Sequence, residues 1–254
     1  MMDSEPRPPA PPGAAAPGAN PLRAGGALLI AVGFFAAQVL GGAFLHFAAA
    51  LWQGGTVDVE GLRGPGALAG IAAAALFLLP VLRALGREQL RDATRLGVAW
   101  QRGSRRALLA GAASGLGVAA LGLFVTLVLF APEPGATFGP MSEMVSTPGV
   151  ARVYLAIVAL VFAPVLEELL FRGLLLSGLS RSWGHTAGAI VASGLFVAVH
   201  VPELAYYWPG TIGILALALT TLALRLRCAA LGPAVAAHLT YNAALLATAF
   251  SVTG

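Results

Sequence analysis

Residues 156–179, AIVALVFAPVLEELLFRGLLLSGL, combine a hydrophobic stretch long enough to cross a membrane with three charges, Glu167, Glu168 and Arg172. About 20 consecutive apolar residues span a bilayer. Charged side chains in such a segment are costly, and they usually face the protein interior or a water-filled cavity. The three charges are therefore candidates for a catalytic centre, a transport relay or a buried structural ion pair.

The spacing of the three charges suggests how their roles divide. Residues four apart share one face of a helix, so Glu168 and Arg172 are expected to pair. Glu167 lies about 100° around the helix from Glu168. Two adjacent carboxylates in a low-dielectric site repel each other, which favours a proton on one of them and suits a general base. An ion pair that only fixes helix packing would leave Glu167 unexplained.

Two further hydrophobic stretches carry polar pairs at helical spacing. FVAVH places Phe196 and His200 four apart, and HLTYN places His238 and Asn242 four apart. Each pair therefore lies on one face of its helix. A single histidine within a membrane more often makes a helix–helix hydrogen bond than performs catalysis. Two histidines, an asparagine and an unpaired glutamate in three of the last four spans favour a shared site.

The three stretches also resemble the motifs of a known family. EELLFR at 167–172, FVAVH at 196–200 and HLTYN at 238–242 fit the patterns EExxxR, FxxxH and HxxxN. In this order, each on a hydrophobic span, they resemble the motifs of the CPBP family of intramembrane proteases. That family includes CAAX-processing proteases of the Rce type and bacteriocin-processing or immunity proteins. The resemblance covers about residues 150–246, with no departure at the motif positions.

The resemblance implies a role for each motif residue. Glu167, together with His200, would activate a water molecule for attack on a peptide carbonyl. His238 and Asn242 would stabilise the oxyanion that forms. Fixed hydrogen-bond donors in a water-poor site are what such an oxyanion requires. The supporting residues would be Glu168, Arg172 and Phe196.

The sequence favours a mechanism without a metal ion or other cofactor. The chain has no HExxH motif, and HLTYN lacks the glutamate that zinc peptidases of that type carry. Asparagine is also a poor zinc ligand. Glu167, His200 and His238 could together hold one zinc ion, so zinc dependence stays open as the alternative.

The composition requires a membrane protein to position these residues. The chain has 254 residues, of which 58% are hydrophobic and only 10% are charged, whereas soluble domains carry about 25% charged residues. We therefore predict an all-α, polytopic membrane protein with about seven transmembrane helices. The predicted spans are about 27–50, 67–85, 107–131, 152–176, 186–201, 210–224 and 229–251. Pro80 is expected to kink the second of these spans.

The arginines predict the orientation of the spans. All fifteen basic residues are arginines, and seven of them lie in the segment 83–106. Basic residues concentrate on the cytoplasmic side of membrane proteins. We therefore assign this segment, the N-terminus and the turns at 177–185 and 225–227 to the cytoplasm. The segment is expected to lie on the membrane surface, which makes membrane lipids its partners.

This topology raises one difficulty. Counted at about 1.5 Å per residue from the predicted span ends, Glu167 and His200 differ in depth by about 10 Å within a hydrocarbon core of about 30 Å. A tilt, a kink at Pro164 or different span ends would have to close that gap if the two residues share a site.

The chain is expected to have four parts. These are a disordered Pro/Ala-rich tail at 1–22, an N-terminal transmembrane region at 23–149 with the Arg-rich cytoplasmic loop 83–106, a CPBP-like protease core at 150–246 and a C-terminal end at 247–254. Small residues at both ends of GAASG, 111–115, indicate that the third span can pack closely.

The predicted function is an intramembrane endopeptidase that hydrolyses a peptide bond through a glutamate-activated water. Its substrate would be a membrane-associated or lipidated peptide or protein, and the resemblance makes a prenylated one a candidate class. Nucleic acid is not an expected partner, because the arginines follow the membrane topology. The alternatives are a zinc-dependent version of the same protease, a proton-coupled transporter and a non-catalytic immunity or scaffold protein. The expected location is the bacterial plasma membrane.

Overall fold

The structure is a computed structural model that describes residues 21–52, 54–55, 59–94, 96–130, 149–201 and 207–253. Most of the tail predicted at 1–22 lies outside these residues. The described residues form helices and turns, and no strand occurs among them. The π-helical segments carry the letter η. The elements are α1 (Ala24–Trp52), α2 (Val59–Arg91), α3 (Arg105–Phe124), η1 (Val125–Leu129), α5 (Val150–Ile157), η2 (Val158–Phe162), α6 (Ala163–Glu168), η3 (Leu169–Leu175), α7 (Leu176–Trp183), α8 (His185–Val199), α10 (Gly210–Cys228) and α11 (Gly232–Thr253).

Among the described residues, seven apolar helical segments confirm the predicted all-α, polytopic fold. Two of the seven are the shorter helix α8 and the 22-residue helix α11. The cytoplasmic position of the N-terminus stays a prediction. The other five segments are long and apolar enough to cross a membrane: Ala24–Trp52, Pro65–Arg91, Arg105–Leu129, Arg152–Trp183 and Gly210–Cys228.

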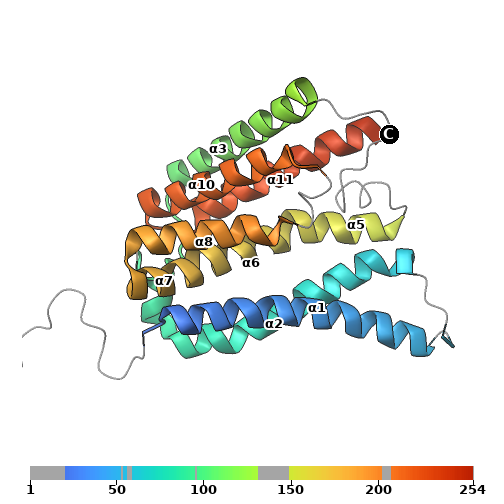
Figure 1. Cartoon of the computed structure of the whole chain (residues 1–254), viewed down its shortest axis with the longest axis horizontal. Coiled ribbons are helices and arrows are strands. Elements are labelled where there is room, and N and C mark those ends of the chain that lie inside the picture. Colours follow the sequence, from blue (N-terminus) through green and yellow to red (C-terminus); the bar gives the residue numbers. More distant parts are fainter. Residues whose placement is uncertain are drawn as a thin grey trace, which may run out of the picture.

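The helices stack in three layers (Figure 1). α1 and α2 pair on one side, and α3, α10 and α11 lie on the other side. The chain from α5 to α8 passes between these two layers and contacts both of them. Polar side chains in the middle layer can therefore be shielded from lipid on both sides.

The middle layer begins with one long helix, Arg152–Trp183, which includes two π-helical segments. In η2 the N–H of Ala163 donates to the carbonyl of Val158, five residues earlier. The next residue, Pro164, has no N–H with which to continue this pattern. The carbonyl of Ala159 is therefore available to a donor from another helix.

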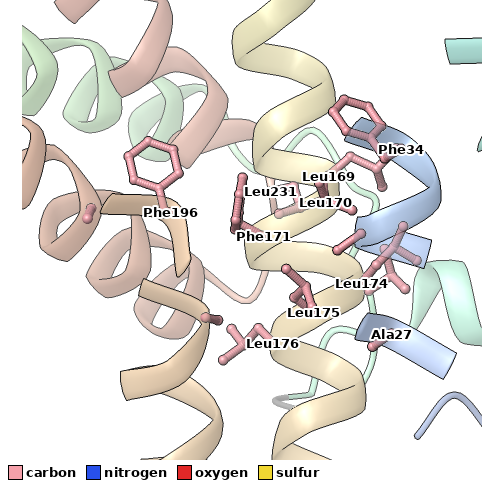
Figure 2. Close-up of a cluster of buried hydrophobic side chains, with 14 of the residues drawn as sticks. Ala27, Phe34, Leu169, Leu170, Phe171, Leu174, Leu175, Leu176, Phe196 and Leu231 are labelled. Atoms are coloured by element: carbon pink, nitrogen blue, oxygen red, sulfur yellow. The ribbon is translucent and has the colours of Figure 1, made fainter. Parts of the chain in front are cut away.

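The buried apolar core surrounds the second half of the long helix (Figure 2). On one side of this helix its leucines meet Ala27 and Phe34 of α1, and on the other side Phe171 faces Phe196 of α8. A helix that is apolar all round and buried is packed against protein on every side. The second half of the long helix is thus the centre of the molecule.

Close contact with α3 positions α11. A Cβ added at Gly111 or Gly115 would overlap backbone carbonyls of α11, so only glycine permits this approach. Thr240 of α11 also donates a hydrogen bond from Oγ1 to the carbonyl of Ala112, 3.0 Å away. The close packing that GAASG allows is therefore present, and it holds the helix that carries the third motif.

Three details differ from the sequence-based expectation. The non-helical backbone in α2 lies at Gly86, with φ of 71°, and the helix continues through Pro80. Glycine adopts positive φ at little cost, which explains the position of the break. The stretch predicted as a turn at 177–185 is mostly helix α7, and the chain turns at Gly184. α10 continues to Cys228, so the predicted turn 225–227 is helical.

Candidate active site

Glu167 and His200 lie at comparable levels in the bundle, which removes the predicted mismatch in depth. The long helix and α8 meet at Gly184, with Glu167 17 positions before this turn and His200 16 positions after it. At about 1.5 Å per residue, both lie about 25 Å from the turn. The depth estimate was wrong because it ended the fourth span at residue 176, whereas the helix runs on to Trp183.

His238 of α11 connects the two glutamates of the long helix. Its Nδ1 lies 2.9 Å from Glu168 Oε1, and its Nε2 lies 3.9 Å from Glu167 Oε2. The side chains of His238 and Glu168 are 4% and 0% exposed, whereas 21% of the Glu167 side chain is exposed. Glu167 is therefore the carboxylate that a molecule entering this space can reach.

The bond to Glu168 also determines the hydrogen position on His238. An ionised carboxylate can only accept, so Nδ1 donates the hydrogen bond. In the neutral ring Nε2 then carries the lone pair, and in the protonated ring Nε2 is a second donor. In either form, the nitrogen nearer to Glu167 is the one left for chemistry.

Arg172 and Glu168 form the predicted ion pair, with 3.4 Å between Nε and Oε2. The guanidinium also donates from Nη2 to the carbonyl of Ala218 at 3.1 Å, and it lies 4.1 Å from the centre of the Phe196 ring. Isolated buried charges are destabilising by several kcal/mol, and these partners offset part of that cost. Nε and Nη1 of Arg172 have no hydrogen-bond partner among the described residues. Arg172 holds Glu168, and Glu168 in turn holds His238.

Phe196 joins the second motif to the other two. Its buried ring lies 5.8 Å from the ring of His238 and 4.8 Å from that of His200, measured between ring centres. His200 Nδ1 donates to the carbonyl of Phe196 at 2.7 Å, and Nε2 makes no hydrogen bond among the described residues, so it is the ring nitrogen available for chemistry. Among the described residues His200 has no direct ion pair with Glu167, and it reaches the cluster through Phe196.

Asn242 follows His238 by one turn, on the same face of α11. Its Nδ2 donates to the carbonyl of Ala159 at 2.8 Å, the carbonyl that Pro164 leaves available. One of the two amide hydrogens is used in this contact, and the other remains for a further acceptor. The π-helical segment η2 thus fixes the side chain of Asn242 beside the cluster.

Sequence reasoning missed the contribution of α10. The carbonyl of Ala218 accepts from Arg172, and Thr221 donates from Oγ1 to the carbonyls of Leu217 and Ala218, at 3.0 and 3.3 Å. Thr221 is fully buried. A residue's type says nothing of its backbone carbonyl, so only the buried threonine could have indicated this helix.

The side chains do not fit a zinc site in this arrangement. No group of three or more His, Cys, Asp or Glu side chains that could hold a metal ion occurs in the described ranges. Glu167 and the Nε2 of His238 could supply two ligands, because the bond from His238 Nδ1 to Glu168 leaves Nε2 available. Catalytic zinc sites use three protein ligands, so no step below is routed through a metal ion.

An apolar groove of about 660 Å³ lies beside the site, between α1, the long helix and α8. All of its lining residues are hydrophobic, among them Phe35, Leu175 and Val199. Phe171 also lines the groove, and its ring contacts that of Phe196, with 5.2 Å between centres. Hydrocarbon is the chemistry that suits this groove, and one phenyl ring separates it from Phe196.

Comparison with known families supports the motif assignment. Residues 149–244 match the family model described as type II CAAX prenyl endopeptidase, Rce1-like. The matched region contains all three motifs, and it confirms the family resemblance predicted from them. No curated protein and no solved structure shows significant similarity to the chain.

Proposed function

Because residues 149–244 match the type II CAAX prenyl endopeptidase Rce1-like family model, we propose that the protein is an intramembrane endopeptidase that uses Glu167 to activate water. The observation that carries this proposal is the position of His238 between two unlike carboxylates. Glu168 is buried and fixed, and Glu167 is partly exposed. Enzymes assign different roles to paired acidic groups by placing them in different surroundings.

In the first step Glu167 removes a proton from a water molecule, whose oxygen forms a bond to the scissile carbonyl carbon. The 3.9 Å between Glu167 Oε2 and His238 Nε2 exceeds a direct hydrogen bond. A water molecule can contact both atoms across such a distance. We assign the free Nε2 of His200 to the same water.

The oxyanion formed in this step is stabilised by His238 and Asn242. Protonated His238 donates Nδ1–H to Glu168 and has Nε2–H available, and Asn242 has its second amide hydrogen. Removing one such donor in other enzymes costs about 2.7–4 kcal/mol of transition-state stabilisation. The proton held by Glu167 then moves to the leaving nitrogen, the C–N bond breaks, and the carboxylate is restored.

The proposed substrate is a membrane-associated peptide or protein whose apolar part occupies the groove lined by Phe35 and Phe171. A prenyl group, as in the family's name, and a hydrophobic peptide segment are two such parts. The many exposed apolar side chains make membrane lipids the surrounding partner. We retain the bacterial plasma membrane as the predicted location.

Cleavage by purified protein in nanodiscs tests the proposal. The substrates are a library of membrane peptides and one peptide prepared with and without a prenyl group. We expect Glu167→Gln to lower kcat/KM by at least about 10³-fold. The matched control is Glu88→Gln, which removes an exposed carboxylate outside the site and should change kcat/KM less than about twofold.

A chelator added to a parallel reaction tests the metal-free mechanism. Unchanged cleavage is expected. Loss of cleavage with the chelator and its recovery with zinc would replace the proposed mechanism by a zinc-dependent one. Cleavage that persists undiminished in Glu167→Gln would contradict the assignment of the base.

A further inference from the structure

Part of the connection between α2 and α3 is folded into the protein rather than lying on its surface. We define residues 96–101 as the buried loop. Val98 and Ala99 within it are 2% and 0% exposed. The N–H of Val98 donates to Gln89 of α2 at 3.1 Å, and the carbonyl of Ala99 accepts from the N–H of Leu231 at 3.0 Å. The buried loop thus connects the end of α2 to the start of α11.

Two arginines from the matched family region hold this loop by its backbone. Arg225 of α10 donates from Nη2 to the carbonyl of Gly97 in the loop at 2.7 Å, and to the carbonyl of Thr94, just before the loop, at 2.8 Å. Arg181 of α7 donates from Nη2 to the carbonyl of Leu96 at 2.8 Å. Arg225 is only 1% exposed. An arginine needed only for membrane orientation would keep its charge in water, so its burial calls for another explanation.

The buried loop contacts the long helix that carries Glu167 and Glu168. A Cβ added at Gly173 would lie 2.9 Å from Cγ1 of Val98, so the valine side chain rests against the backbone of η3. Gly173 follows Arg172, which holds Glu168 by its ion pair. Any shift of the helix at Gly173 therefore acts on the residues that hold His238.

One face of α10 links the buried loop to the site a second time. The carbonyl of Ala218 accepts from Arg172. Arg225 lies seven positions later, about two turns along the same face, and holds the loop. Both residues are buried, as is Thr221 between them. The same helix thus binds the loop at one end and, farther along, Arg172, which supports Glu168.

We propose that Val98, held in place by Arg225 and Arg181, is a positioning residue. Through its contact with Gly173 it fixes the position of the long helix that carries Glu167 and Glu168. This inference rests on the proposed peptidase function and extends it to a segment outside residues 149–244. Its consequence is that releasing the buried loop lowers the rate of the chemical step without weakening substrate binding.

The first test removes the hydrogen bonds that Arg225 donates to the backbone at Thr94 and Gly97. Arg225→Met loses both carbonyl contacts, and Arg225→Lys keeps the charge without the planar fork. Arg227→Met is the matched control, because this arginine lies on the same last turn of α10 but is exposed. We expect kcat to fall about tenfold or more in Arg225→Met with KM unchanged, since small misplacements of catalytic groups are costly. Arg225→Lys should be intermediate, and Arg227→Met should match the wild type.

Hydrogen exchange measured by mass spectrometry on the same proteins reports the structure independently of cleavage. Faster exchange is expected in Arg225→Met for peptides covering 96–101 and 169–175, with no change in Arg227→Met. If the wild-type protein cleaved nothing, the proposed function would fail while these exchange rates still decided the positioning role. Unchanged exchange at 169–175 in a variant whose loop is released would overturn the inference.

The second test uses the contact between Val98 and Gly173. Gly173→Ala should lower kcat because its new methyl group pushes against Val98. Val98→Ala should lower kcat because the contact between the valine side chain and Gly173 is lost. The double variant should recover most of the activity lost in Gly173→Ala, because the smaller side chain at position 98 makes room for the new methyl group. A double-mutant cycle measures this coupling. Additive effects of the two substitutions would contradict a direct contribution of the contact.

Discussion

α1 and the long helix Arg152–Trp183 are both long and apolar enough to cross a membrane, but they occupy opposite environments. Only four residues of α1 are buried: Ala24, Ala27, Ala31 and Phe34. In contrast, every residue of the long helix from Glu168 to Ser180 is buried. Hydrophobicity alone thus shows that a helix can enter the membrane, while the charges show which helix is surrounded by protein.

The two helices also differ in what holds them in place. Lipid tails are as apolar as leucine, so small residues and polar contacts drive helix association in membranes. α1 meets α7 through such small residues: a Cβ at Gly178 would lie 2.5 Å from that of Ala27. The long helix adds buried polar contacts at Glu168 and Arg172. Substitutions should therefore have unequal effects in the two helices.

The largest difference is expected for the buried charge. Arg172→Met would leave Glu168 without its counter-ion, and breaking a buried ion pair in this way costs about 3–5 kcal/mol. Arg23→Met, at an exposed position just before α1, should cost less than about 0.5 kcal/mol. Denaturant titration of the two purified variants measures both values. Equal unfolding midpoints would show that the buried ion pair contributes no more to the free energy of unfolding than the exposed arginine.

The histidines of the two regions should differ next. His200→Ala is expected to lower kcat/KM about 10²-fold, because its free Nε2 is assigned to the attacking water. His46→Ala in α1 should change kcat/KM less than about twofold, since this ring packs against Gly66 of α2. Peptide cleavage by both variants tests this difference. A similar loss in the two variants would remove His200 from the proposed mechanism.

A matched pair of leucines tests packing without any charge. Leu174→Ala in the long helix should lower the free energy of unfolding by about 2–4 kcal/mol, because Leu174 is fully buried and a cavity would remain. Leu29→Ala in α1 removes a side chain that is 72% exposed and should cost less than about 0.5 kcal/mol. The comparison requires the same titration in one detergent. An equal cost at both positions would mean that α1 is covered by a partner.

The last difference is expected for the amide side chains. Asn242→Ala should lower kcat about 10²-fold, at the lower end of the effect of losing one oxyanion donor, since His238 still supplies the other. KM should stay the same. Gln38→Ala in α1 should leave both constants within about twofold of the wild type. A rise in KM for Asn242→Ala with kcat unchanged would assign this residue to substrate binding instead.

Much of the fold and several contacts within the candidate site followed from residue types at fixed spacing. Glu168 and Arg172 pair as their four-residue separation indicates. His238 reaches the glutamates because the face it shares with Asn242 meets the long helix. These relations are local, so helix geometry alone predicts them.

What the sequence did not reveal depends on contacts between distant segments. Arginine counts predict the side of the membrane, but they do not show that Arg225 turns inward to bind a loop 128 positions earlier. The π-helical pattern that presents Ala159 to Asn242 likewise depends on how the two helices meet. The relative depth of Glu167 and His200 was misjudged because hydrophobicity does not mark the end of the long helix, which runs on to Trp183.

The position of the buried loop also has a consequence for biosynthesis. Its anchoring partners lie later in the chain, with Arg225 separated from Thr94 by 131 positions. At synthesis rates of about 5–20 residues per second, the ribosome needs on the order of ten seconds to supply that partner. The first helices therefore enter the membrane before their connecting loop can settle. During this interval residues 96–101 are accessible to a chaperone or to the translocation machinery. The interval ends when α10 and α11 have been synthesised and bind the loop.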